Sequence, residues 1–148
     1  MPIPDLSTDG LLPDGLHECT LDEVIERFGR FQDSDRRPSL GRELQQYVAE
    51  VRSAEVGKYL VVDGSFVTSK PSPSDIDLLL VLRDDVNLGE VVPPFRYNAR
   101  SRTYIRKKYR FDFFPAFDGD GSADAVIRFF RQVKYRPGEV KGLLKVTL

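Results

Sequence analysis

The sequence contains one cysteine, Cys19, and one histidine, His17. A single cysteine excludes an internal disulfide, and this scarcity suits a reducing compartment such as the cytoplasm. The same scarcity leaves no Cys/His pattern for a zinc site. His17 is also far in sequence from the acidic residues discussed below, so we do not expect it to be catalytic.

Long hydrophobic runs are also missing. The longest, Leu78 to Leu82, is far shorter than the about 20 apolar residues that a membrane-spanning helix needs. The first residues are acidic and proline-rich, unlike a basic and then apolar signal peptide. We therefore expect a cytoplasmic chain that does not associate with a membrane.

Charge is balanced overall but unevenly distributed. The chain has 148 residues, of which 41% are hydrophobic and 30% charged, as expected for one soluble domain. Residues 1–35 carry nine acids and two bases, whereas residues 96–148 carry thirteen bases and five acids. An ordinary uneven surface explains this pattern, and so does a basic face for phosphate or nucleic acid.

Hydrophobic periodicity and turn residues predict interleaved helices and strands, which indicate an α/β or α+β domain. We expect an irregular arm over 1–19 and a domain over 20–148, in which Thr20 and Glu23 form a capping box. Its expected helices are 21–28, 39–56 ended by Gly57, and 122–133 capped by Ser122. Its expected strands are 59–62, 76–82, 109–114 closed by Pro115, and 142–148, with a partly helical segment at 95–108.

Two aspartates, Asp75 and Asp77, stand at the start of the most apolar predicted strand. Residues i and i+2 of a strand share a face, so their carboxylates lie close together while Ile76 points into the core. Magnesium suits such a pair, because it takes one or two carboxylates together with substrate phosphates. The alternative is that both aspartates are ordinary turn and strand-entry residues.

A third carboxylate, Asp112, lies in the aromatic strand YRFDFFPAF. An aspartate there is costly to bury without a cation. If its strand lies beside that of Ile76, Asp112 can join Asp75 and Asp77 around two metal ions, which clamp the oxygens of a phosphoryl or nucleotidyl transfer. The alternative is a structural pair with Arg110 or another base.

The pair Gly64-Ser65 precedes the aspartates and follows an apolar run. Glycine allows a sharp turn and a close approach to a ligand, and the serine hydroxyl with nearby amides can bind phosphate oxygens. The set of Gly64, Ser65, Asp75, Asp77 and Asp112 resembles the nucleotidyltransferase superfamily with the polymerase-beta-like fold. The segments LLPDGLHECTLDEVIERFG and KGLLKVTL also look like a family of small, uncharacterised bacterial nucleotidyltransferase-like proteins.

This resemblance implies an α+β domain with a mixed sheet flanked by helices, and transfer of a nucleoside monophosphate from an NTP. It implies that Asp75 and Asp77 hold both Mg²⁺ ions. It implies that Asp112 holds the catalytic metal and helps to deprotonate the acceptor hydroxyl. Gly64 and Ser65 would grip the triphosphate, and Lys70 is a further candidate phosphate contact because its loop joins Gly-Ser to the aspartates.

Two features depart from the superfamily pattern. Minimal members usually carry Arg-Gly shortly after Gly-Ser, where this chain has Phe66-Val67-Thr68. The 33 residues after Pro115 are also too few for a helical acceptor domain. A protein or RNA acceptor would then be held by the basic segment 96–110, by a partner protein, or by a second copy.

The segment 96–110 carries seven bases and three tyrosines, and it is either a binding surface or a solvated face.

Two functional hypotheses follow from the sequence as a whole. The first is a magnesium-dependent nucleotidyltransferase. The second is a weakly active or inactive interaction module of this fold, such as an antitoxin-like or phage-defence component.

Overall fold

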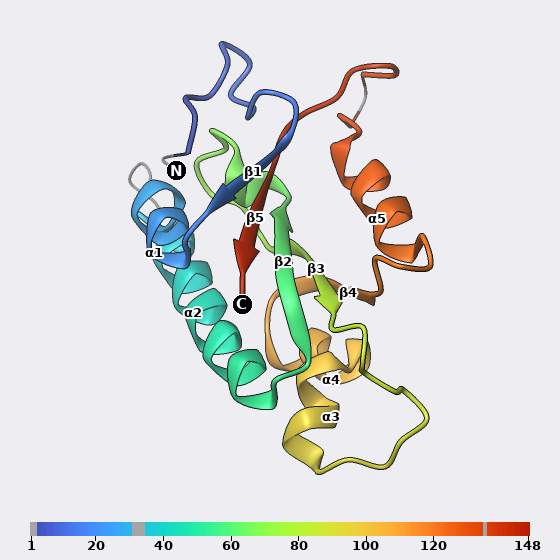
Figure 1. Ribbon diagram of the computed structural model, residues 1–148. Helices are drawn as coiled ribbons and strands as arrows, with labels where there is room; N and C mark the ends of the chain where they lie inside the picture. Colours follow the sequence, from blue (N-terminus) through green and yellow to red (C-terminus); the bar gives the residue numbers. More distant parts are fainter. Residues whose placement is uncertain (1–2, 31–34, 135) are drawn as a thin grey trace.

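Five strands form one mixed sheet in the computed structural model, which describes residues 3–30, 35–134 and 136–148 (Figure 1). The order across the sheet is β1-β5-β2-β3-β4, in which β1 pairs with β5 and β3 with β4 in parallel, and the central pairs are antiparallel. The strands are β1 Leu16–Cys19, β2 Gly57–Asp63, β3 Ile76–Leu82, β4 Phe111–Ala116 and β5 Leu143–Thr147. The expectation of a single α+β domain with a mixed sheet is confirmed.

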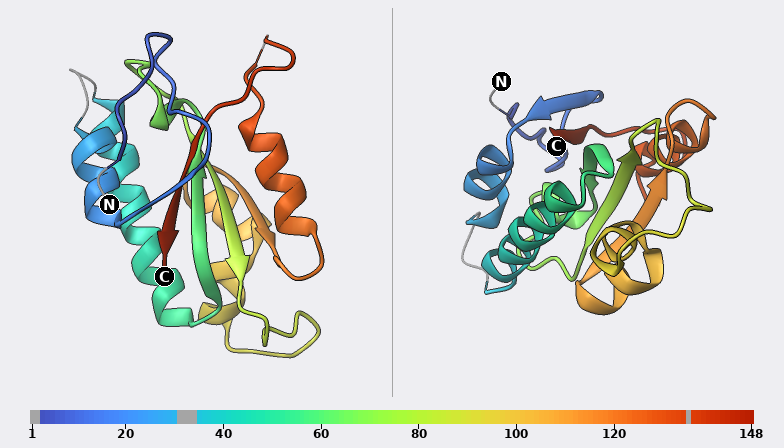
Figure 2. Two further views of the ribbon diagram at one scale, coloured as in Figure 1. Left: turned by 45° about the horizontal axis from the view of Figure 1, so that its top comes forward. Right: turned by 60° about the horizontal axis from the view of Figure 1, so that its bottom comes forward.

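Helices cover the two faces of the sheet unequally. One face packs against α2 (Arg36–Ala54), with a larger core that also takes in side chains of the π-helix η1 (Ile25–Gly29), α3 (Pro94–Arg100) and α4 (Arg102–Lys108). The other face carries α5 (Ser122–Arg131) over a smaller cluster that includes Val61, Leu79 and Phe130. Figure 2 shows α2 and α5 on opposite sides of the sheet. No helix within the described ranges is both long enough and apolar enough to cross a membrane.

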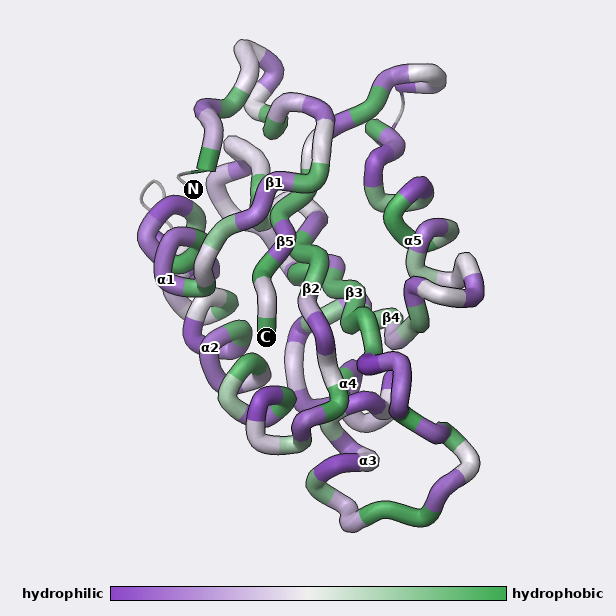
Figure 3. The backbone as a smooth tube through the Cα atoms, viewed as in Figure 1, coloured by the Kyte–Doolittle hydropathy of each residue, from purple (hydrophilic) through white to green (hydrophobic). Residues whose placement is uncertain are grey.

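Strand β3 is apolar except at Asp77, because both of its faces are covered. Ile76, Leu78 and Leu80 belong to the core on the α2 side, whereas Leu79 and Val81 belong to the cluster on the α5 side. A strand buried on both faces is a continuous apolar run rather than an alternating one. Figure 3 shows this as a hydrophobic stretch in the middle of the sheet.

The predicted capping box starts the first helix. The Thr20 hydroxyl accepts a hydrogen bond from the Glu23 backbone N–H, and the Glu23 carboxylate accepts one from the Thr20 backbone N–H. Helix α1 (Leu21–Val24) then continues as η1 to Gly29, so the predicted helix 21–28 is a short α-helix followed by a π-helical turn. The capping motif therefore determines where the helix begins, as expected.

The predicted role of Gly57 as the end of the long helix is wrong. Helix α2 ends at Ala54, and Glu55 adopts the left-handed conformation with φ of 54°. Gly57 instead begins β2, where a Cβ atom would lie 2.5 Å from a methyl carbon of Leu148 and 2.7 Å from one of Leu80. Gly57 is therefore closely packed against leucine side chains, and it does not terminate the helix.

Three further boundaries differ from expectation. Leu16–Cys19, placed in the irregular arm, form β1, because the short strand gains its hydrogen bonds from β5, which is far away in sequence. Pro115 lies within β4, where it is tolerated because β4 is an edge strand. Gly121 with φ of 84°, and not Ser122, caps α5, while the Ser122 hydroxyl bonds to the preceding loop.

The largest fully buried side chain is that of Arg37 on α2. Its guanidinium donates hydrogen bonds to backbone carbonyls on two separate segments, one in η1 and one over residues 65–70. The distances are 3.0 Å to Phe28, 2.6 Å to Phe66, 3.4 Å to Ser65, 2.7 Å to Thr68 and 2.6 Å to Lys70. Burial lowers the pKa of Arg37 to about 10, so the guanidinium stays charged at neutral pH.

Replacing this guanidinium should strongly destabilise the protein. Arg37→Met removes the donors and leaves several buried carbonyls without a partner, which should lower the free energy of unfolding by about 3 kcal/mol or more. The measurement is urea unfolding followed by circular dichroism.

The neighbouring substitution Arg36→Met is the matched control, because Arg36 is exposed. It should change the free energy of unfolding by no more than about 0.5 kcal/mol. Similar effects of the two substitutions would contradict the role assigned to Arg37.

Candidate functional site

The turn after β2 brings Gly64 against Asp77. Gly64 has φ of 91°, a conformation that favours glycine, and it leads into the 3-10 helix η2 (Ser65–Val67). A Cβ atom on Gly64 would lie 3.1 Å from the Asp77 backbone nitrogen and 3.3 Å from its carboxylate. The Gly-Ser turn and the Asp-x-Asp segment, predicted to act together, therefore lie side by side.

The segment after Gly64 is held in place by Arg37. Besides the bonds to Arg37, the Thr68 hydroxyl donates to the Ser65 carbonyl at 2.7 Å and accepts from the Lys70 backbone N–H at 3.2 Å. The backbone carbonyls of this loop therefore point inward to Arg37, while the Lys70 side chain is exposed. Ser65 is half-buried beside the turn.

Strand β3 places its two aspartates differently. Asp75 precedes the strand and is exposed, whereas Asp77 lies within it and is half-buried. Ile76 between them is fully buried in the core, as predicted. The pair therefore stands where a rigid strand meets solvent.

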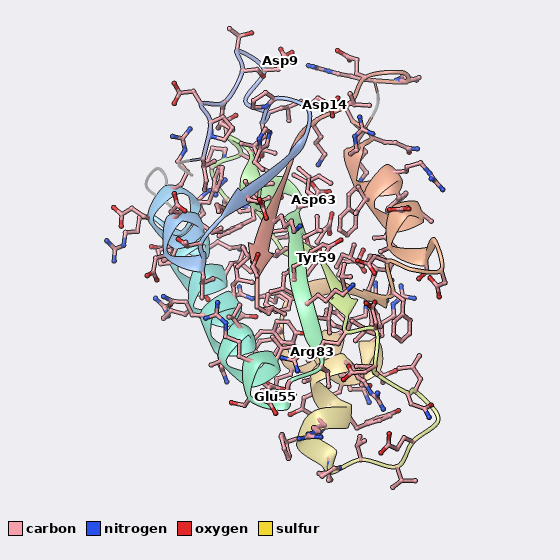
Figure 4. All side chains as sticks on the ribbon, in the orientation of Figure 1. Asp9, Asp14, Glu55, Tyr59, Asp63 and Arg83 are labelled. Carbon is pink, nitrogen blue, oxygen red and sulfur yellow. The ribbon has the colours of Figure 1, made fainter. Side chains whose placement is uncertain are left out.

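Asp77 belongs to a row of three aspartates. It is the register partner of Asp63 on β2 and of Asp112 on β4. Paired residues on neighbouring strands lie about 5 Å apart and point to the same face. That face is the one carrying α5, and Figure 4 labels Asp63 at the upper end of β2, between β5 and α5. Asp75 is not part of the row, but it is close enough to act on the charge of Asp77.

Asp63 is the acidic residue that the sequence reasoning missed. It is 2% exposed, and its carboxylate accepts a hydrogen bond from the Lys141 ammonium at 2.6 Å. Strand periodicity could have found it, because Asp63 is two residues from Val61 and four from Tyr59 and so lies on their face. Asp63 was not considered a site residue because it directly precedes Gly64, and an aspartate before a glycine is also typical of a simple turn.

Burial and like charges act together on Asp77. Its burial, with the nearby carboxylates of Asp63 and Asp75, raises the pKa of Asp77 to about 6, against the lowering effect of Lys141 and Lys134. Burial also raises the pKa of Asp63, whereas Lys141 and the Gly64 backbone N–H lower it. Within the described part of the chain, Asp77 itself has no ion pair.

Asp112 has a cation of its own. Its carboxylate is bonded to the Arg106 guanidinium of α4, which also lies over the Phe114 ring. Arg110 does not supply this cation, since it binds Glu43 and Ser39 on α2. The structure thus contains the Asp112–arginine pair named as the alternative, with Arg106 as the partner.

Carboxylate oxygens, the ligands that Mg²⁺ prefers, are available at Asp75 and Asp77. Over the described residues, no three His, Cys, Asp or Glu side chains are grouped so as to hold a metal ion. Two carboxylates still fit this ion, because it keeps waters or substrate phosphates as its other ligands. The donor set of β3 therefore fits Mg²⁺ delivered with a phosphate, whereas Asp112 is occupied by Arg106.

Most bases of the segment 96–110 are already paired. Arg110 binds Glu43, Lys108 binds Glu50, Arg106 binds Asp112, Arg96 lies 3.9 Å from Glu55, and Arg100 is only 7% exposed. Arg102 lies over the Phe114 ring, and Lys107 is exposed. Of the three tyrosines, Tyr97 is the exposed one. The segment is therefore mainly a paired surface, with little free charge for RNA.

His17 lies in β1, where its ring Nε2 donates to the Pro13 carbonyl at 2.6 Å. It holds the turn before the strand.

The raised pKa of Asp77 predicts a pH-dependent stability. The folded state binds a proton at the Asp77 carboxylate more tightly than the unfolded state does. The resulting contribution to the free energy of unfolding is therefore complete below about pH 4 and is lost as the pH rises through about 6. The substitution Asp77→Asn removes the negative charge that burial and the nearby carboxylates destabilise. It should therefore raise the free energy of unfolding at pH 7.5 by about 2 kcal/mol, with a smaller gain at pH 4.5.

Urea unfolding at the two pH values measures this difference. Asp85→Asn is the control, because Asp85 is exposed and follows the opposite end of β3. If Asp77→Asn raises the free energy of unfolding equally at both pH values, burial does not destabilise the charge of the Asp77 carboxylate.

Comparison with known proteins adds a family to this geometry. A family model described as a family of unknown function (DUF6932) matches residues 4–147. No curated protein and no solved structure matches the chain. The matched range includes all five strands, the Gly-Ser turn and the aspartate row. The chain therefore belongs to the DUF6932 family.

Proposed function

We propose that the protein is a magnesium-dependent nucleotidyltransferase that moves a nucleoside monophosphate from an NTP to a protein or RNA acceptor. The observation that carries the proposal is the close packing of the Gly64 turn beside Asp77, where a Cβ atom on Gly64 would lie 3.3 Å from the carboxylate. It places a turn suited to binding phosphate beside two carboxylates suited to binding magnesium, at the start of a rigid strand. Such a rigid arrangement is what group transfer between bound reactants requires.

Asp75 and Asp77 are the residues that would hold magnesium. When bound, the ion neutralises the charge that builds up on the phosphate oxygens. Asp77 lies at the site with its negative charge destabilised by burial and by Asp63. A divalent cation would relieve that destabilisation, which favours this carboxylate as a ligand.

The triphosphate would bind along the turn that follows β2. The absence of a side chain on Gly64 lets the turn lie close to Asp77, and the Ser65 hydroxyl with the adjacent backbone N–H groups can donate to phosphate oxygens. Lys70 stands exposed at the far end of the same loop, where its ammonium can reach an anion. Arg37 fixes the backbone of this loop from inside the core.

Asp112 would act on the acceptor. The acceptor hydroxyl oxygen attacks the α-phosphorus, the bond from this phosphorus to the bridging oxygen of pyrophosphate breaks, and pyrophosphate leaves. The hydroxyl proton passes to a carboxylate, a role that the resemblance gives to Asp112. Because Asp112 is bonded to Arg106, this role requires Arg106 to move aside when the substrates bind.

The two aspartates of β3 should be needed for nucleotide binding. We expect calorimetric titration of ATP, GTP, CTP and UTP, each with Mg²⁺, to show at least one that binds the wild-type protein. The double substitution Asp75→Asn/Asp77→Asn should weaken that binding by about 100-fold or more, because the metal loses its protein ligands.

The control is Asp84→Asn/Asp85→Asn, which removes two aspartates just beyond the other end of β3. It should bind the same nucleotide as wild type. Failure of all four nucleotides to bind the wild-type protein, or equal binding by the Asp75/Asp77 variant, would overturn the proposal.

One observation favours the second hypothesis, an interaction module. Four large apolar side chains are exposed on the loop before α3 and on α3 itself: Leu88 at 60%, Val91 at 97%, Phe95 at 52% and Tyr97 at 55%. Figure 3 shows the hydrophobic stretches of this loop, which follows the end of β3 opposite to the aspartates. Exposed aromatic and apolar side chains of this kind mark protein–protein interfaces.

A second copy of the protein is the binding partner for this surface that can be tested with the purified protein alone. Light scattering after size exclusion should show a dimer that Val91→Glu/Phe95→Glu converts to a monomer. A variant without Asp75, Asp77 and Asp112 should remain a dimer if this surface acts independently of the nucleotide site. A monomeric wild-type protein would contradict this role for the surface.

A further inference from the structure

The segment before β5 holds Lys141 rigidly. The backbone N–H of Lys141 donates to Arg131 at the end of α5, and that of Gly142 donates to Leu12 in the N-terminal arm, both at 2.9 Å. Gly142 has no room for a side chain, because a Cβ atom would lie 1.9 Å from the Pro13 carbonyl oxygen. The backbone at Lys141 is therefore fixed from both sides.

The Lys141 ammonium lies at one end of the aspartate row. It is 2.6 Å from Asp63, and the two side chains are 13% and 3% exposed. Asp63 directly precedes Gly64, whose backbone N–H helps to lower the pKa of the Asp63 carboxyl. The carboxylate of Asp63 thus links the Gly-Ser turn to the ammonium of Lys141.

Stability alone does not explain this ion pair. Taking both charges out of water costs about as much as their attraction returns, so apolar side chains would serve the fold equally well. An ammonium has three N–H donors. One bonds to Asp63, and no other residue in the described part of the chain accepts a hydrogen bond from Lys141. Two donors therefore remain available beside the turn.

We propose that Lys141 is a phosphate-binding residue, which contacts the polyphosphate tail of the nucleotide, and that Asp63 is the residue that positions it. This inference rests on the proposed nucleotidyltransferase function and adds a substrate contact to it. Asp63 holds the ammonium next to Gly64 and Ser65, where the tail would lie. A cation at this point offsets the charge of the tail that the aspartates would otherwise repel.

The test uses inorganic tripolyphosphate with Mg²⁺ as the probe, titrated calorimetrically into the full chain. We expect Lys141→Met to raise the dissociation constant at least tenfold and Lys141→Arg to change it by less than threefold. Lys145→Met is the control, because Lys145 lies in the strand that follows Lys141, against the Tyr59 ring, and should bind as wild type does.

The double substitution Asp63→Asn/Lys141→Met separates binding from structure. It removes both charges of the Asp63–Lys141 pair together, so it keeps the test valid even if Lys141→Met alone unfolds. We expect its dissociation constant to stay at least tenfold above that of wild type. Wild-type binding by this variant would show that Lys141 only neutralises Asp63, and would overturn the inference while leaving the proposed function intact. Failure of the wild-type protein itself to bind tripolyphosphate would overturn both.

Discussion

The hydrogen bonds of the Arg37 guanidinium organise the site from within the core. The guanidinium of Arg37, at the start of α2, donates hydrogen bonds to carbonyls of η1 and of the loop after β2. It thereby connects three segments that are separate in the sequence. Buried carbonyls need such partners, because an unpaired one costs about 1–3 kcal/mol. The conformation of the Gly-Ser turn therefore depends on a residue that lies on the other side of it from the aspartates.

The three aspartates of the row illustrate how one face can hold several like charges. Asp63 is compensated by Lys141 and Asp112 by Arg106, and each cation comes from an element outside the strands that carry the aspartates. Asp77, between them, is the member that has no ion pair within the described residues. Its charge is therefore the one most open to an added cation, which agrees with its place in the proposed magnesium site.

Local patterns in the sequence predicted the central residues of the candidate site but not the residues around them. The β3 strand, the capping box at Thr20, and Asp75 and Asp77 were predicted because each depends on residues within a few positions. The ion pair of Asp63 with Lys141 and the interior role of Arg37 depend on residues 9 to 78 positions apart, which no local pattern contains. The same reason explains why β1 was missed, because its only partner strand in the sheet comes at the far end of the chain.

The order of the strands has a consequence for local unfolding. β1 joins the sheet through β5 alone, while β5 is held between β1 and β2. Any opening that releases β5 from β2 therefore also removes β1 and the segment that carries Lys141. In hydrogen exchange, the first and last strands should behave as one cooperative unit, separate from the β2–β3–β4 part that retains Asp63, Asp77 and Asp112. In the partly open state, the three aspartates would remain in place on the sheet after Lys141 has been released.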